Sequence, residues 1–418
     1  MKPSARVAAA VSTALLLSLL LVFAAAPAAA QYFGRNQVRW EQFDFHQLET
    51  EHFRVYHYPA GNPAAEDAAR MAERWYGRLS TAFGHDFAEK KPIVLYNDHA
   101  DFQQTALAGG ELIGEGTGGF TEPYRDRVVL PLTANYADTD HVLGHELVHV
   151  FQFDIAQSMR PVGQQGAATR AVGLESLPLW MVEGLAEYLS QGRNDTLTSS
   201  WMRDAVLRDD LPTLEEMSRD LRYNPYQYGQ AMWAYVAGRW GDPKAAELFK
   251  ASLRFGPEEA FKNVLGLDWK QFGEEWHRDV KAYYQPILAE RQKPGEVGRE
   301  LIGRKVGGRL AVSPVLSPDG RWLAFLSTRG IFDVDLYLAD AHTGEVVRRL
   351  AKADRDPHVD ALRFIESAGT WSPDGKQFAF PVVAHGDNRV LVVDVDSGRV
   401  RERLDPRVGE VTNLSWSP

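Results

Sequence analysis

Two histidines and a glutamate stand at a spacing that can bind and use a metal ion, in His145-Glu146-Leu147-Val148-His149. Residues four apart lie on one face of an α-helix, so His145 and His149 can present both imidazoles to a single Zn²⁺. Glu146 then lies beside the metal, where its carboxylate can take a proton from zinc-bound water and deliver it to a leaving amine. The pattern predicts a zinc metallopeptidase, a hydrolase of peptides or proteins with Glu146 as general base.

Two histidines do not complete a zinc site, so a third ligand must come from elsewhere in the chain. A metzincin would need a glycine three residues and a histidine six residues after His149, but Gln152 and Ile155 stand there. A second amphipathic segment follows 34 residues after His149, and its central carboxylate is Glu183. We therefore expect Glu183 to be the third zinc ligand.

Helices are needed to position these ligands. Apolar residues three and four apart predict a helix over 140–157, with Asp138 or Thr139 as its N-cap. The same spacing over 179–190 predicts the helix that carries Glu183. Two further helices are predicted at 63–83 and 228–253.

Shorter runs of β-branched and aromatic residues predict strands before the zinc helices. They lie at 52–58 and 92–96, and a hairpin is expected from Gly118 to Leu132 with its turn near 123–126. The fold class is therefore α+β, with a mainly helical domain over 31–290.

The run from Trp180 to Tyr188, Trp-x-x-Glu-Gly-x-Ala-Glu-Tyr, resembles the second zinc helix of gluzincins, which include the thermolysin-like clan. In that helix the first glutamate binds zinc, which implies the same role for Glu183. Glu187 lies one turn later, and the resemblance implies that it accepts the free N–H of a ligating histidine. Such a carboxylate fixes the tautomer of the histidine.

Amide hydrolysis develops an oxyanion that a neutral hydrogen-bond donor stabilises. The segment 225–235 resembles the helix start of gluzincin aminopeptidases, where a Tyr-x-x-Gly motif carries the oxyanion-binding tyrosine. The resemblance implies that this residue is Tyr226, with Tyr228 as the alternative. A packing role for both tyrosines stays open.

Gluzincins also pair an edge strand with the substrate backbone, and Gly118-Gly119-Phe120-Thr121-Glu122 is the candidate. Gly118, Gly119 and Phe120 are therefore expected to bind substrate, although the glycines could instead relieve crowding in a hairpin. The related aminopeptidase element, Gly-x-Met-Glu-Asn, holds the substrate amine with its glutamate. Thr121 takes that place here and Glu122 is displaced by one, so an endopeptidase is expected.

The helical pattern stops at about residue 290, and a polar stretch over 291–305 reads as a linker. Beyond it, over 306–418, Ser-Pro-Asp-Gly and a following apolar strand occur at 317–325 and again at 372–380. A third copy begins at Trp416, and the spacings of 55 and 45 residues are close to those of propeller blades. The segments resemble the TolB-type (PD40 or WD-like) propeller repeat. Since a propeller needs at least about four blades, we expect two blades of a longer protein.

The first thirty residues predict a signal peptide. Lys2 and Arg6 precede an apolar run over 8–26, and small residues at 28–30 suit cleavage before Gln31. A retained membrane anchor is the alternative. We expect an exported protein, periplasmic or extracellular, with outer-membrane association left open.

Composition restricts the partners and the metal ligands. The formal net charge is −10, and the chain lacks the basic stripe that nucleic-acid binding requires. It contains no cysteine, so a bound metal must use His, Asp or Glu. The whole chain resembles TolB-precursor-like envelope proteins, which combine a gluzincin-like domain with propeller repeats. That implies an envelope protein partner for the propeller, and the alternative function is an inactive envelope scaffold of TolB-like type. Oligomeric state is not indicated.

Overall fold

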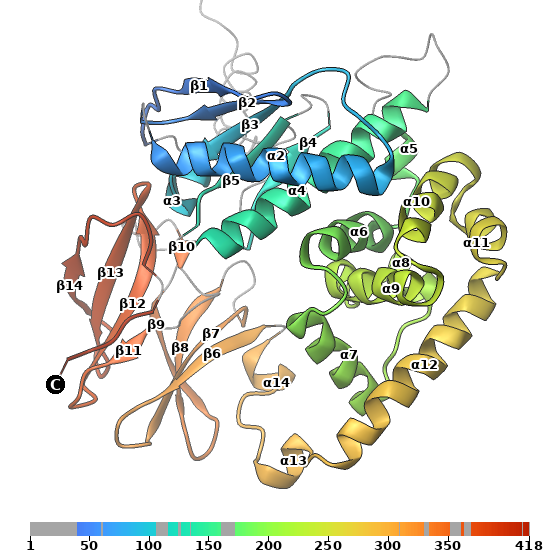
Figure 1. Ribbon diagram of the computed structural model, residues 1–418. Helices are drawn as coiled ribbons and strands as arrows, with labels where there is room; N and C mark the ends of the chain where they lie inside the picture. Colours follow the sequence, from blue (N-terminus) through green and yellow to red (C-terminus); the bar gives the residue numbers. More distant parts are fainter. Residues whose placement is uncertain are drawn as a thin grey trace, which may run out of the picture. The chain divides into compact units, whose positions relative to one another are not determined.

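The structure is a computed structural model, and its fold is a mixture of helices and strands that confirms the α+β class (Figure 1). None of the helices in the described part of the chain has the length and apolar character that a bilayer span requires. The predicted signal peptide at 1–30 lies outside the described residues. These are 40–59, 62–105, 116–123, 127–133, 135–159, 172–308, 310–329, 334–351, 361–362, 369–411 and 413–417.

A mixed sheet of five strands forms the first part of the fold, in the order β1-β2-β3-β5-β4. Its three central strands are parallel, and β1 and β4 pair antiparallel at the two edges. The predicted strands are confirmed, β4 and β5 pair antiparallel as the predicted hairpin requires, and β4 is an edge strand as expected. Residues 124–126 of the predicted turn lie outside the described residues. The bounds are β1 His46–Glu49, β2 Phe53–His57, β3 Lys91–Tyr96, β4 Phe120–Glu122 and β5 Arg127–Pro131.

The helix that carries both histidines is α4, Tyr136–Ser158. Its N-cap is Asn135, whose side chain accepts a hydrogen bond from the backbone N–H of Asp138. The prediction of Asp138 or Thr139 as N-cap was therefore wrong, because the helix begins earlier and Asn135 accepts from one of the free N–H groups of its first turn. The helix predicted to carry Glu183, α6, is Leu179–Gln191, close to its predicted bounds.

The single helical stretch predicted over 228–253 is two helices. Helix α9, Pro225–Trp240, ends at Gly241 with a φ of 95°, and α10, Pro243–Phe255, starts at a proline. Apolar spacing continues across the break, which explains why periodicity did not detect it. The remaining helices are α2 Pro63–Phe83, α3 His99–Phe102, α5 Val172–Glu175, α7 Thr196–Arg208, α8 Leu214–Arg219, α11 Pro257–Leu265, α12 Trp269–Ala289, α13 Pro294–Val297 and α14 Arg304–Gly307.

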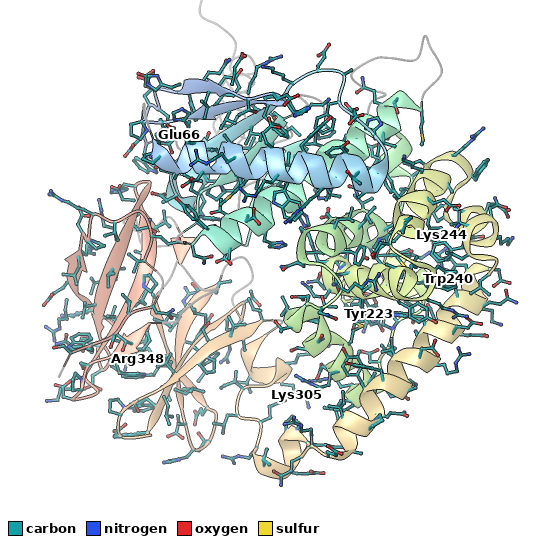
Figure 2. All side chains as sticks on the ribbon, viewed as in Figure 1. Glu66, Tyr223, Trp240, Lys244, Lys305 and Arg348 are labelled. Atoms are coloured by element: carbon teal, nitrogen blue, oxygen red, sulfur yellow. The ribbon has the colours of Figure 1, made fainter. Side chains whose placement is uncertain are left out.

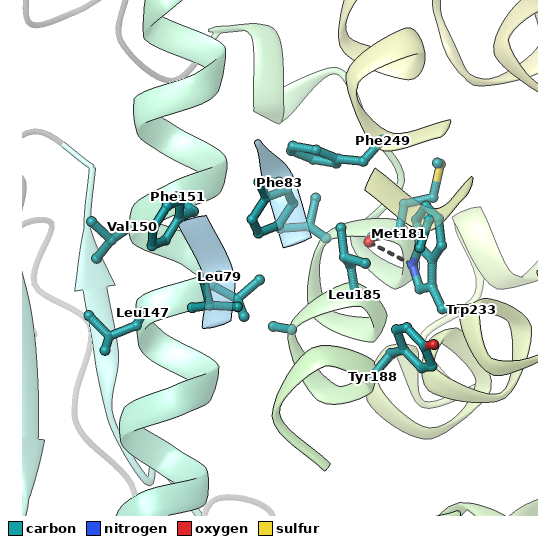
Figure 3. Packing of buried hydrophobic residues seen from close by; sticks show 14 of the residues in the cluster. Leu79, Phe83, Leu147, Val150, Phe151, Met181, Leu185, Tyr188, Trp233 and Phe249 are labelled. Carbon is teal, nitrogen blue, oxygen red and sulfur yellow. Dashed lines mark hydrogen bonds between the residues drawn. The ribbon is translucent and has the colours of Figure 1, made fainter. Parts of the chain in front are cut away.

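Aromatic side chains fill the space between these helices (Figure 3). The ring of Phe83 on α2 lies 5.7 Å from Phe151 on α4 and 5.9 Å from Phe249 on α10. Trp233 is fully buried, and its indole N–H donates to the carbonyl of Met181 at 3.0 Å. Each such buried side chain contributes about 1.5–3 kcal/mol to the free energy of unfolding.

The opposite face of α2 is polar and carries the exposed Glu66 (Figure 2).

The chain from Ala311 to Leu404 forms two antiparallel sheets, and each contains one copy of the repeat. In the first copy the Ser317 hydroxyl donates to Asp319 and accepts from the backbone N–H of Trp322, and Ser372 does the same with Asp374 and Gln377. The glycines of the two turns, at 320 and 375, have φ of 72° and 68°. The repeat is therefore a recurring hydrogen-bonded turn. The strands are β6 Ala311–Leu316, β7 Trp322–Ser327, β8 Asp335–Asp340, β9 Val346–Ala351, β10 Ala361–Leu362, β11 Thr370–Trp371, β12 Gln377–Ala384, β13 Asp387–Asp394 and β14 Val400–Leu404.

The predicted linker over 291–305 contains α13 and the start of α14. The domain bounds 1–30, 31–290, 291–305 and 306–418 stay predictions.

Helices α6 and α9 cross with glycine against glycine. A Cβ built at Gly184 would overlap the backbone of Gly229, and a Cβ at Gly229 would overlap the carbonyl oxygen of Trp180. The two helices can therefore approach this closely only because neither position has a side chain.

Replacing Gly184 with alanine should force α6 and α9 apart and lower the free energy of unfolding by about 1–3 kcal/mol, the range for overpacking. Gly77→Ala on α2 is the matched control, since nothing lies within 4 Å of a Cβ there. The control should be neutral or stabilising by about 0.5–1 kcal/mol. Urea unfolding followed by circular dichroism measures both, and equal stabilities would contradict the close crossing.

A half-buried acid in α3, Asp101, gives the stability a pH dependence. Tyr58 donates a hydrogen bond of 2.6 Å to Asp101. Burial and the charge of Asp98 raise the pKa of Asp101 to about 7, although the hydrogen bond from Tyr58 lowers it. Because this pKa exceeds that of an unfolded aspartate, about 3.9, the folded state loses stability as the pH rises from about 4 to 7.

Asp101→Asn removes the ionisation and should raise the Tm at pH 8 but leave it nearly unchanged at pH 4. Asp44→Asn is the control, since the Asp44 side chain is 96% exposed. Thermal unfolding at the two pH values measures the difference. An equal Tm change at both pH values would show that Asp101 does not titrate as described.

Candidate metal centre

Helices α4 and α6 bring the three predicted ligands together. The Nε2 atoms of His145 and His149 lie 3.1 Å apart, and Oε2 of Glu183 lies 3.3 Å from the first and 3.2 Å from the second. Both histidines are buried. In the described part of the chain this is the group of three side chains with metal-binding geometry.

The donor set fits a zinc ion. Zn²⁺ takes imidazole and carboxylate ligands at about 2.0–2.2 Å in a tetrahedron, so two of its ligand atoms lie about 3.3–3.6 Å apart. The observed separations of 3.1–3.3 Å are close to that edge. Two histidines and one carboxylate are also the set found in hydrolases that keep a fourth position open.

The remaining imidazole nitrogens face acceptors. Nδ1 of His145 lies 3.1 Å from Oε1 of Glu187, the carboxylate that was predicted to accept an N–H of a ligating histidine. Nδ1 of His149 lies 2.8 Å from Oε1 of Gln152. When both imidazoles are neutral and carry their proton at Nδ1, both Nε2 lone pairs face the Glu183 carboxylate, and the three acceptors repel one another unless a proton or a metal ion lies between them.

The charges of these side chains also favour a bound cation. Burial lowers the pKa of His145, but its hydrogen bonds with Glu183 and Glu187 outweigh burial and raise the pKa to about 10. Burial raises the pKa of Glu183, yet the charge of His149 and the hydrogen bonds from both histidines hold it well below its ordinary value. The carboxylates therefore create a negative potential that attracts a proton or a metal ion.

Glu146 is buried, and its carboxylate is held by an adjacent strand. The Thr121 hydroxyl lies 2.7 Å from Oε2 of Glu146 and 3.0 Å from its backbone carbonyl. Burial raises the pKa of Glu146, while the charges of His149 and His145 lower it in part. Sequence reasoning missed this role of Thr121, although it noted the threonine as a departure from the aminopeptidase element.

The predicted substrate strand lies against this carboxylate. A Cβ built at Gly119 would lie 3.1 Å from Val142 and Leu130 and 3.2 Å from Cγ of Glu146. Gly119 therefore relieves crowding, the alternative that the sequence left open. The Phe120 ring packs on Phe102 at 5.7 Å.

Of the two candidate tyrosines, Tyr226 lies at the site. Its ring stacks at 5.8 Å on the ring of His145, and burial together with the charge of Glu183 raises the pKa of its phenol. Tyr228 is buried and packs against Trp201 and Tyr223, so it has the packing role.

A pocket of about 450 Å³ opens beside these residues. Its walls come from the segment before β4, from α4 and α6, and from the start of α9. They combine small residues with acidic and aromatic ones. The lining residues are Gly116, Thr117, Gly118, Gly119, His141, Val142, His145, Glu146, Glu187, Asn224 and Tyr226.

Comparison with known proteins finds similarity to TolB. No protein-family model matches the chain. The Tol-Pal system protein TolB of Hydrogenovibrio crunogenus is 28% identical over 114 residues, which are 27% of this chain and 22% of that protein. A solved TolB from Acinetobacter baumannii is 24% identical, with a TM-score of 0.18, and covers 23% of this chain and 21% of its own. A putative TolB from Agrobacterium tumefaciens is 25% identical, with a TM-score of 0.18, and covers 24% and 35%.

The similarity is partial, and TM-scores of 0.18 do not indicate a shared overall fold with the solved structures. The chain spans about a fifth of the length of the curated TolB that it matches. The match supports TolB-like repeats in this chain and gives no support to a gluzincin domain, which stays a prediction.

Proposed function

We propose that this chain is an exported zinc-dependent peptidase, with His145, His149 and Glu183 as metal ligands and Glu146 as general base. The observation that supports it best is the convergence of three acceptor atoms within 3.1–3.3 Å of one another. A cation relieves the repulsion between them, and the ligand types and separations suit zinc.

Zinc bound there would polarise a scissile carbonyl and lower the pKa of a coordinated water. Glu146 would act as the general base that takes the proton of this water. Thr121 engages Oε2 of Glu146, so the proton would be taken up at Oε1 and passed to the leaving amine. Tyr226 would donate a hydrogen bond from its phenol O–H to the developing oxyanion. The raised pKa of that phenol keeps it protonated at neutral pH.

The substrate would be an extended peptide. Strand β4 pairs with β5 on one side and is an edge of the sheet, so its other side can add a peptide strand. Glu122, the carboxylate nearest to the position of the aminopeptidase glutamate, is buried and paired with Arg127. It is therefore not available to hold a free amine, which favours endopeptidase cleavage.

The second candidate is a catalytically inactive envelope scaffold that binds a protein partner through the propeller repeats. The similarity to TolB favours this candidate, and the comparisons offer nothing for the first. Both candidates place the protein in the periplasm or outside the cell, and neither involves nucleic acid. They differ in metal content and in turnover.

Glu146→Gln should lower kcat on unfolded casein by about 10²–10⁴-fold and leave the zinc content unchanged, because it removes the base but no ligand. Glu183→Ala should weaken zinc binding by more than about 100-fold, since losing a ligand costs more than losing its supporting group. Metal analysis and casein cleavage by the chain from Gln31 measure both.

Glu215→Gln is the control, because this carboxylate is exposed on α8. A metal-free and inert parent would favour the scaffold. A parent that cuts casein equally well after Glu146→Gln would refute the assigned base.

Thr121→Val removes the hydroxyl that holds Glu146 and keeps the shape of the side chain. We expect kcat to fall by about tenfold, roughly the loss of one hydrogen bond to a charged group, with KM and zinc content unchanged. Thr121→Ser should restore most of kcat because it restores the hydroxyl. A serine variant as slow as the valine variant would assign Thr121 a packing role instead.

A further inference from the structure

Gln152 is a fully buried amide one helical turn beyond His149. Its Oε1 lies 2.8 Å from Nδ1 of His149, and its Nε2 donates to the backbone carbonyl of Val182 at 3.0 Å. Val182 directly precedes Glu183 in α6. The side chain therefore links both helices that carry the proposed ligands.

The hydrogen-bonding chemistry of this link allows one arrangement. A backbone carbonyl only accepts, so the amide NH₂ must face Val182, and this places Oε1 against His149. Since Oε1 also only accepts, Nδ1 of His149 must carry a proton. A neutral imidazole has one such proton, and the lone pair of His149 is then at Nε2.

The opposite orientation of the amide is unfavourable. It would place Oε1 of Gln152 against the Val182 carbonyl at 3.0 Å, two buried acceptors without a proton between them. A buried acceptor that loses its donor costs about 1–3 kcal/mol. The carbonyl of Val182 thereby determines which nitrogen of His149 is protonated.

The lone pair that results points at the other ligand atoms. Nε2 of His149 lies 3.1 Å from Nε2 of His145 and 3.2 Å from Oε2 of Glu183. Glu187 faces Nδ1 of His145 from the other side. A carboxylate thus supports one histidine, and a neutral amide anchored to the ligand helix supports the other.

We infer that Gln152 is a positioning residue that holds His149 in the Nδ1–H tautomer and thereby sets the affinity of the site for zinc. The inference rests on the proposed zinc site and concerns metal binding, which can be measured without turnover. Supporting groups of this kind change metal affinity by about 10–100-fold.

The test is the zinc Kd of the chain from Gln31, measured by competition with a chromophoric chelator, for the parent and for Gln152→Leu. Leucine fills a similar volume without an acceptor, so we expect zinc to bind about 10–100-fold more weakly. Gln230→Leu is the matched control. Gln230 is 1% exposed, and its amide donates to the carbonyl of Gly192, away from the ligands. This control should lose stability but keep the parent Kd.

Gln152→Glu keeps an acceptor for Nδ1 of His149, so its zinc Kd should lie closer to that of the parent than the Kd of the leucine variant does. If the leucine variant does not fold, the Kd of Gln152→Glu tests the inference in its place. If Gln152→Leu binds zinc with the same Kd as the parent, the inference is wrong but the zinc site stands. The same conclusion follows if Gln152→Glu binds zinc no better than Gln152→Leu. A parent that binds no zinc would overturn both the proposed function and the inference.

Discussion

The proposed site depends on how closely α6 and α9 cross. Gly184 follows Glu183 directly, and Gly229 lies one turn after Tyr226, so the glycine contact places a ligand and a candidate oxyanion donor on neighbouring helices. A side chain at either glycine would separate the helices and move Tyr226 away from His145, on whose ring it stacks. The same crossing buries Trp233 against α6, through its hydrogen bond to the Met181 carbonyl. The close packing of the α6 and α9 backbones therefore also sets the geometry of the proposed site.

Helix α4 is tied to its surroundings by polar groups as well as by its apolar face. Gln152 joins it to α6, Glu187 joins α6 back to His145, and Thr121 joins it to the edge strand β4. Each of these contacts lies in a buried or half-buried environment, where an unmade hydrogen bond is costly. The network fixes the direction of each imidazole and of the Glu146 carboxylate, as the proposed hydrolysis requires.

Much of this arrangement follows from short-range patterns. The four-residue spacing of His145 and His149 and the apolar period of their helix indicated one face and two imidazoles, and Glu183 was found from a second helix of the same type. Contacts between distant segments were not accessible in this way. Thr121 reaches Glu146 only because β4 lies along α4, and Gln152 gains its role only because α6 presents the Val182 carbonyl. The break between α9 and α10 was missed because apolar periodicity continues across Gly241.

The central claim is that α4 and α6 build a zinc site from two imidazoles and one carboxylate. Its most direct test is the zinc K-edge X-ray absorption spectrum of the protein loaded with one equivalent of zinc. Zinc bound to these residues should have four ligands at about 2.0–2.2 Å, with the multiple-scattering signature of two imidazoles that is lost in His145→Ala and His149→Ala. A spectrum of an ion surrounded only by oxygen, or one that neither substitution changes, would contradict it.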